Sequence, residues 1–210
     1  MNLEQIRDSI RIRLGVPTND NFYTDVVLDD LVNEAIQAIS IEADWPWLQD
    51  SATITTAAGT QAYTPTVDAG HVWLRTRVLT PTDRGEPLSL RSLSEIREYL
   101  STDQAEPQYY CVSGEQILLA PIPNAVKTIT HDYVRQETPL VNNTDEPALP
   151  LPFRYAIVHL AAAMGHLRQN QPERWGSEMR SYNEWLGRMN KSIQRVTANK
   201  RVRVRRGSML

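Results

Sequence analysis

A change of hydrophobic period at residues 44–48 constrains this chain more than any other feature. Residues 28–39 carry apolar side chains every three or four positions, which predicts an amphipathic helix. The corner sequence Asp-Trp-Pro-Trp-Leu follows, and Pro46 prevents the helix from continuing because it lacks a backbone N–H donor. Residues 52–56 and 59–65 then alternate, as β-strands do. The chain therefore passes from a helical layer to a sheet here.

Helical patterns near both ends of the chain predict a bundle. Residues 2–14 and 28–39 provide two helices, and two further helical patterns lie between residues 152 and 193. The predicted fold class is α+β: an antiparallel helical bundle from the N- and C-terminal segments, with an inserted antiparallel β domain and an extended C-terminal tail. The predicted domains are 1–49 (N-terminal helical pair), 50–138 (β domain with one short helix), 139–196 (loop and C-terminal helical pair) and 197–210 (basic tail).

Three local signals organise the predicted β domain. Asp83-Arg84-Gly85 is a turn signal between β-like runs at residues 72–79 and 88–90. Ser113-Gly114 separates residues 109–112 from 116–119 and predicts a hairpin. Ser92 and Glu95 have the spacing of a capping box, which predicts a short helix that places Ile96, Tyr99 and Leu100 on its apolar face.

The charged residues are distributed very unevenly along the chain. Residues 1–184 contain 14 basic and 25 acidic side chains, whereas residues 185–210 contain 8 basic side chains and no acidic one. Such a block of charge is typical of an interaction arm, because opposite charge accelerates and orients the encounter with a partner. The acidic body itself does not favour dedicated nucleic-acid binding.

The basic C-terminal tail is the strongest functional signal in the sequence. Beyond residue 197 arginine and valine alternate, which predicts an extended segment suited to an acidic groove or a sheet edge on a protein. The same arginines would also suit DNA phosphates, and a solvated, disordered terminus is the third interpretation. The residues assigned to partner docking are Lys191, Arg195, Lys200, Arg201, Val202, Arg203, Val204, Arg205 and Arg206.

The aromatic corner of Trp45, Pro46 and Trp47 has two possible uses. The two rings could form an exposed platform for a carbohydrate or a protein partner. Aromatic residues at a junction between a helix and a strand more often fill the space between the two layers. We therefore predict that these residues have a structural role.

No catalytic, cofactor or metal site is expected from the sequence. The four histidines, at positions 71, 131, 159 and 166, do not have the spacing of a zinc site, and Cys111 has no nucleophile turn or adjacent histidine. No phosphate-binding or dinucleotide-binding glycine motif occurs. Residues 1–5 do not start an export signal, and the longest apolar run, residues 156–167, is too short for a bilayer. We expect neither enzymatic activity nor membrane insertion.

The order of elements around the corner resembles a known family. A helix, the Asp-Trp-Pro-Trp-Leu corner, a Thr-rich strand, a glycine turn and the strand Gln61-Ala62-Tyr63-Thr64-Pro65 follow one another, as in the head-to-tail adaptor proteins of tailed bacteriophages. The resemblance implies a structural adaptor in the virion, assembled in the host cytoplasm. It also implies a ring of twelve copies that joins the portal vertex to the neck or tail and continues the DNA channel.

The same resemblance implies the partners. These are the portal protein, neighbouring copies of the chain and a downstream neck or tail protein, with DNA only as cargo of the channel. In similar adaptors the C-terminal segment docks on the portal, and this role is transferred here to residues 191–206. The alternative function is that of a DNA-binding accessory protein that uses the same basic tail.

Overall fold

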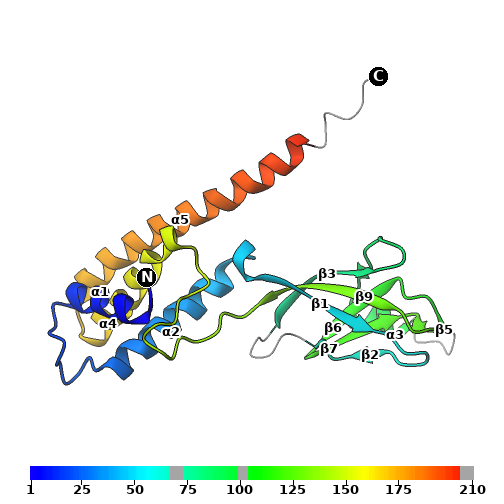
Figure 1. The fold of residues 1–210 in the computed structure, drawn as a ribbon, viewed down its shortest axis with the longest axis horizontal. Coiled ribbons are helices and arrows are strands. Elements are labelled where there is room, and N and C mark those ends of the chain that lie inside the picture. The colour runs from blue at the N-terminus through cyan, green and yellow to red at the C-terminus, as the bar shows by residue number, and fades with distance from the viewer. Residues whose placement is uncertain (67–72, 99–103, 204–210) are drawn as a thin grey trace. The chain divides into compact units, whose positions relative to one another are not determined.

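The chain forms two compact units, as the computed structural model in Figure 1 shows. The structure describes residues 1–66, 73–98 and 104–203. The helical unit comprises Met1–Trp47 and the chain from Glu137 onward, and the β unit comprises Leu48–Gln136. The sheets are therefore inserted between two parts of one helical unit. The α+β class predicted from the sequence is confirmed.

Helix α1 spans Leu3–Leu14 and has a defined stop at each end. Asn2 and Gln5 close a capping box in which each side chain accepts a hydrogen bond from the other residue's amide, at 3.0 and 3.1 Å. Gly15 ends the helix with a φ of 69°, a left-handed conformation that glycine adopts without steric cost. The apolar positions predicted for this helix are all buried: Leu3, Ile6, Ile10 and Leu14.

Helix α2 spans Asp25–Glu42 and includes the whole of the helix predicted at residues 28–39. The Thr24 hydroxyl caps it by accepting a hydrogen bond from the Val27 amide at 3.4 Å. A short 3-10 turn, η1 at Pro46–Leu48, follows the end of the helix. The predicted end of the helix before Pro46 is confirmed.

Helix α4, Tyr155–Arg168, lies at the centre of the helical unit. The 3-10 turn η2 at Leu151–Phe153 precedes it, and α5, Pro172–Arg203, follows it. Helix α4 contacts α1, α2 and α5, so its side chains are buried around most of its circumference. The buried residues of α4 are Ala156, Ile157, Val158, His159, Leu160, Ala161, Ala162, Ala163, Gly165 and His166.

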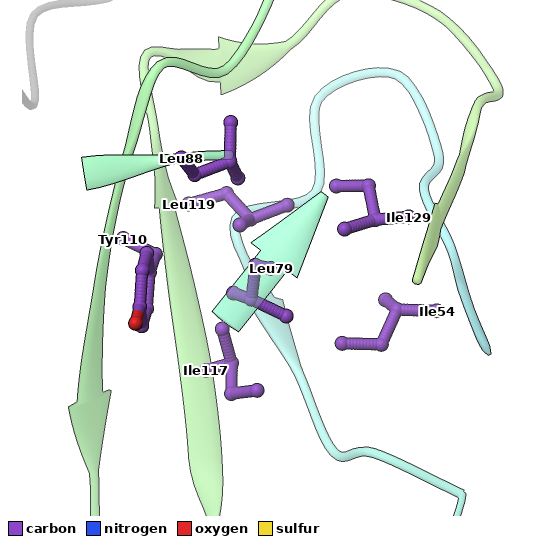
Figure 2. Close-up of a cluster of buried hydrophobic side chains, with 7 residues drawn as sticks. All are labelled: Ile54, Leu79, Leu88, Tyr110, Ile117, Leu119 and Ile129. Carbon is purple, nitrogen blue, oxygen red and sulfur yellow. The ribbon is translucent and has the colours of Figure 1, made fainter. Parts of the chain in front are cut away.

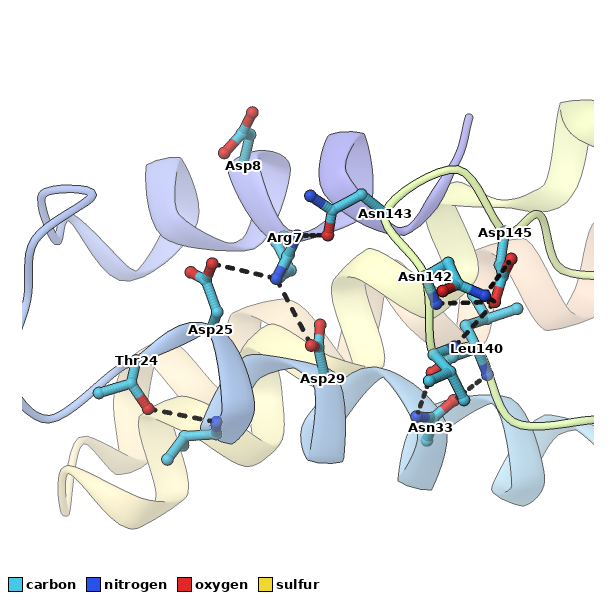
Figure 3. A network of polar contacts seen from close by, with 12 residues as sticks. Arg7, Asp8, Thr24, Asp25, Asp29, Asn33, Leu140, Asn142, Asn143 and Asp145 are labelled. Atoms are coloured by element: carbon cyan, nitrogen blue, oxygen red, sulfur yellow. Dashed lines mark hydrogen bonds and ion pairs between the residues drawn. The ribbon is translucent and has the colours of Figure 1, made fainter.

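The segment that returns from the β unit is held on α2 by side-chain hydrogen bonds (Figure 3). The Asn33 side chain accepts from the Leu140 amide at 2.8 Å and donates to the Leu140 carbonyl at 3.0 Å. Asp145 accepts from the amides of Val141 and Asn142 at 2.9 and 2.8 Å. These bonds satisfy backbone groups that neither a helix nor a sheet pairs.

A buried arginine joins the returning segment to both N-terminal helices (Figure 3). The Arg7 guanidinium lies 3.2 Å from Asp25 and 3.4 Å from Asp29, and it donates to the Asn143 side chain. Only 5% of the Arg7 side chain is exposed, so its charge requires these partners. Burial raises the pKa of Asp29, and the neighbouring Arg7 acts in the opposite direction.

Arg154 organises the chain just before α4. Its guanidinium donates to the carbonyls of Leu149 at 2.9 Å, Pro147 at 3.2 Å and Met1 at 2.8 Å, and it lies 3.0 Å from the Glu146 carboxylate. One planar, multiply donating side chain therefore connects the first residue of the chain to the entrance of the central helix.

The β unit contains three small sheets in its described part. The first has the order β1-β9-β3 and is antiparallel, with strands Gln49–Thr55, Thr128–Arg135 and Trp73–Pro81. The second has the order β2-β7-β6-β4, with strands Ala62–Tyr63, Gln116–Ala120, Tyr109–Ser113 and Ser89–Leu90. The third pairs β5 with β8, at Gln104–Ala105 and Ile122–Pro123, and the short helix α3 spans Leu93–Glu98.

Side chains from the first two sheets share one hydrophobic core (Figure 2). Each fully buried aliphatic side chain contributes roughly 1.5–3 kcal/mol by removal from water. The β unit therefore has a hydrophobic core of its own. Its members are Ile54, Leu79, Leu88, Tyr110, Ile117, Leu119 and Ile129.

Two of the three local signals predicted for the β unit are confirmed. Ser113-Gly114 forms the predicted hairpin, with Ser113 opposite Gln116 and a φ of 60° at Gly114. The capping box is also confirmed, because the Glu95 amide donates to the Ser92 hydroxyl at 3.3 Å and the Ser92 amide donates to Glu95 at 2.9 Å. Ile96 is fully buried, whereas residues 99 and 100 lie outside the described residues.

The prediction of a wholly antiparallel β domain was wrong. The runs on either side of Asp83-Arg84-Gly85 belong to different sheets, because β3 pairs with β9 and β4 pairs in parallel with β6. Backbone hydrogen bonds hold the turn, from the Gly85 amide to the Pro81 carbonyl at 3.1 Å and from the Leu88 amide to the Leu79 carbonyl at 2.8 Å. Strands β5 and β8 are also parallel. Each of these strands pairs with a strand that is distant in the sequence, so the local turn signal did not determine the strand order.

The predicted extended conformation from residue 197 also differs from the structure. Helix α5 continues to Arg203, so residues 197–203 are helical. The remaining tail residues, 204–210, lie outside the described residues. Arginine has a high helix propensity and valine an intermediate one, and a helix that has already formed extends at little free-energy cost per residue.

Replacing Gly165 with alanine tests the close packing of α4. The new Cβ would lie 2.9 Å from a Leu14 methyl carbon, and such overpacking costs about 1–3 kcal/mol, of which better helix propensity returns about 0.5–1 kcal/mol. We expect the free energy of unfolding in urea to fall by about 1 kcal/mol. Gly187→Ala on α5 is the control, because nothing lies near its Cβ. Equal stability of the two variants would contradict the prediction.

Candidate functional site

The candidate docking residues lie at the end of a helix that is much longer than its partner. Helix α5 has 32 residues and α4 has 14, which correspond to about 48 and 21 Å of helix. Tyr155, the first residue of α4, stacks on Trp185 with ring centroids 6.3 Å apart. The part of α5 beyond Trp185 therefore extends past the start of α4, as Figure 1 shows.

The structure places most of the predicted docking residues on this extension. Lys191 is exposed on α5, and Arg195, Lys200, Arg201, Val202 and Arg203 follow along the same helix. Val204, Arg205 and Arg206 lie outside the described residues. In a helix successive residues are 100° apart, so alternation of arginine with valine does not separate them onto two edges as it would in a strand.

A cluster of polar contacts around Glu178 anchors the first half of α5 to the rest of the helical unit. Glu178 lies 2.6 Å from the His159 ring on α4 and 3.2 Å from the Arg13 guanidinium on α1. His159 and Glu178 are both largely buried. Because these contacts connect three helices, we infer that the base of the basic extension has a fixed direction.

Three side chains at the base of the extension were not singled out by sequence reasoning. The Arg188 guanidinium lies over the Trp185 ring, 4.7 Å from its centroid, and Trp185 stacks on Tyr155. A cation over an indole face is attractive, and tryptophan, tyrosine and arginine are enriched in protein interfaces. The i, i+3 spacing of Trp185 and Arg188 on a helix is the signal that could have identified them.

The aromatic corner is packed within the helical unit. Trp45 is fully buried, and its indole N–H donates to the Ile39 carbonyl at 2.6 Å. Its ring stacks on Trp47 with centroids 4.9 Å apart, and Trp47 lies 6.3 Å from Phe153. Pro46 is exposed. The Trp45 ring is therefore not part of an exposed platform, and the structural role of the corner stays a prediction that a substitution can test.

The three described histidines each have a hydrogen-bonding partner, and Cys111 is a buried free thiol. The rings of His131, His159 and His166 contact Thr76, Glu178 and Gln171, respectively, and position 71 lies outside the described residues. Among the described residues, no three histidine, cysteine or acidic side chains converge on a possible metal position. Burial raises the pKa of the Cys111 thiol, which disfavours the reactive thiolate.

Comparison with protein families identifies one match. Residues 1–209, almost the whole chain, match the family described as SU10 adaptor protein. No curated protein matches the chain. In the described part of the structure no helix is both long and apolar enough to span a lipid bilayer.

Replacing Trp45 with alanine tests the structural role of the corner. Removal of a fully buried indole leaves a cavity, so we expect a loss of about 3–5 kcal/mol in the free energy of unfolding, measured by urea denaturation. Pro46→Ala removes an exposed neighbour and should change stability by less than about 1 kcal/mol. A Trp45→Ala protein as stable as the Pro46→Ala control would show that the ring is not a structural plug.

The buried ring of His131 predicts a pH dependence of stability. Burial lowers its pKa from 6.5 to about 4, so between these values the unfolded chain binds a proton that the folded chain does not. Stability should therefore fall with decreasing pH from 6.5 to about 4, by up to about 1.4 kcal/mol per pH unit from this group. In His131→Gln, which cannot titrate, urea denaturation should show a shallower fall. Identical slopes in the two proteins would contradict the prediction.

Proposed function

The chain belongs to the SU10 adaptor protein family, and on this basis we propose that it joins the portal vertex of a tailed-phage virion to the neck or tail. The family consists of structural phage proteins, so the coarse role is that of a structural adaptor in the virion. A structural family also agrees with the expectation that the chain is not an enzyme. The finer role that we propose has three parts: a ring of copies of the chain, a DNA channel through that ring, and a C-terminal arm that docks on the portal protein.

The proposed assembly is a ring of twelve copies that continues the DNA channel. The excess of acidic residues in positions 1–184 supports a channel lining that repels DNA and therefore permits it to slide during ejection. The separate β unit, with its own core, provides a surface for the downstream neck or tail protein. This division would leave the helical unit available for contacts within the ring.

The single observation that carries the docking proposal is the basic extension of α5. The helix is anchored by Glu178, passes the start of α4 at Trp185 and then carries only basic charges. We propose that residues 191–206 bind an acidic groove on the portal protein. Arginine suits such a groove because its guanidinium forms paired hydrogen bonds with carboxylates.

The alternative function is DNA binding by the same extension. Eight basic residues and no acidic one after Glu184 would also suit contacts with phosphates. The acidic body opposes this alternative, because it would weaken the attraction of the whole chain to DNA. Portal docking is therefore the better-supported function.

Co-sedimentation with the portal ring tests the proposal directly. The full-length chain and a chain truncated after Thr197 are each sedimented with the portal ring of the same phage, with plain duplex DNA as the competitor. We expect the full-length chain to saturate the portal and the truncated chain to lose binding at least about tenfold, because the truncation removes five basic residues.

A chain with residues 198–206 in scrambled order is the matched control, because its charge is unchanged. Reduced portal binding by this variant indicates a fitted groove, whereas unchanged binding indicates that charge alone is recognised. Binding to DNA but not to the portal, with a steep dependence on salt, would support the alternative function instead.

A further inference from the structure

We propose that neighbouring copies of this chain associate head to tail, with the outer face of α2 in one copy packed against the arginine–aromatic face of the next. The arginine–aromatic face consists of Leu151, Tyr155, Trp185 and Arg188. The outer face of α2 consists of Val26, Asp30, Glu34, Gln37 and Ile41. The inference rests on the proposed ring and identifies the surfaces that would form it.

The arginine–aromatic face has the composition of a protein interface. Leu151 is 63% exposed and Tyr155 is 47% exposed, although both are large apolar side chains. The stacked pair of Tyr155 and Trp185 forms a rigid surface, and Arg188 lies against the indole. Rigid aromatic side chains beside an arginine are typical of the residues that dominate binding energies, because little conformational entropy is lost when they are covered.

The outer face of α2 is an exposed stripe with the opposite charge. Its residues recur every three or four positions and fall within an arc of about 80° on the helix. Val26 and Ile41, at its ends, are 70% and 63% exposed. Asp30 and Glu34 lie between them, and Glu34 meets Arg168 at 3.6 Å in an exposed pair that contributes little.

The two faces complement each other in chemistry. One provides a cation among aromatic and aliphatic groups, and the other provides carboxylates between two aliphatic side chains. Contact would cover the exposed apolar side chains of both surfaces and place Arg188 near Asp30. Opposite charges orient such an encounter and disfavour pairing of like faces. Contact between the arginine–aromatic face of one copy and the α2 face of another is therefore more favourable than contact between two identical faces.

The positions of the helices fit a head-to-tail contact. Helix α4 contacts both α2 and α5, whereas, in the described part of the chain, α2 and α5 make few contacts with each other. The two faces thus belong to two different helices that both pack on α4. A contact between different faces leaves one unused face at each end of a pair, so copies can be added until a ring closes. Association of identical faces would stop at a dimer.

Reversing charge on each face separately tests the proposal. The first variant is Arg188→Glu with Leu151→Glu, and the second is Asp30→Arg with Ile41→Arg. Self-association of each purified full-length chain is measured by sedimentation velocity, alone and on the portal ring. We expect each variant to associate at least about tenfold more weakly than the unchanged chain, because like charges meet across the contact.

An equimolar mixture of the two variants gives the sharpest outcome. In a head-to-tail contact the unchanged α2 face of the first variant can bind the unchanged arginine–aromatic face of the second. The remaining faces of this pair carry glutamates at positions 151 and 188 and arginines at positions 30 and 41, which also attract each other, so the mixture should recover association that neither variant shows alone, starting from 1:1 pairs. Failure to form the pairs, or full-sized assemblies from either variant alone, overturns the proposal.

Two controls distinguish a head-to-tail contact from a general effect of charge and from DNA binding. Arg180→Glu reverses one exposed charge on α5 about 12 Å along the helix from Arg188 and about 140° around it from Trp185, and it should leave association unchanged. If Arg188→Glu with Leu151→Glu lowers binding to duplex DNA but leaves self-association unchanged, the arginine–aromatic face is a nucleic-acid surface and the proposal is wrong. If the unchanged chain forms no assembly either alone or on the portal, the proposed ring itself fails, together with this inference.

Discussion

The helical unit depends on the close packing of α4 against three other helices. A helix that is buried around most of its circumference needs small residues where neighbours approach, and the run Ala161-Ala162-Ala163 with Gly165 meets this need. The Leu14 side chain occupies the space that a side chain at residue 165 would fill, and the Tyr23 hydroxyl donates to the Gly165 carbonyl at 2.7 Å. The helix therefore combines tight packing with backbone groups that have partners.

The polar residues around α4 follow from the same constraint. Burying a histidine or an arginine is costly unless other groups pair with its polar atoms or its charge. His159 meets Glu178, and Arg154 meets several carbonyls of the preceding loop. These contacts connect distant parts of the chain, so they also fix where α5 and the returning segment are attached. The basic extension of α5, which we propose as the docking arm, begins beyond these contacts.

The charge of the proposed docking region was readable from the sequence, whereas its conformation was not. The block of basic residues after Glu184 is visible in the chain itself and indicates an interaction arm without any fold. The sequence did not determine its conformation, because alternation of arginine and valine favours a strand only when a sheet edge is available to pair with it. In this chain a preceding helix with strong tertiary contacts continues into the segment, up to Arg203. In the absence of a partner, residues 197–203 of the basic tail are therefore helical.

Local chemistry in the sequence determined the helix caps, the end of α2 before Pro46, the Ser113-Gly114 hairpin and the α+β class, because each depends on residues that are close together in the chain. Only the tertiary structure decided that β3 pairs with β9 rather than with β4, and that Tyr155 meets Trp185. Strand partners and stacked rings are selected by how distant segments pack, and a single sequence does not state which apolar runs will meet. For the same reason, the charge of the basic extension was readable from the sequence, whereas the aromatic surface at its base was not.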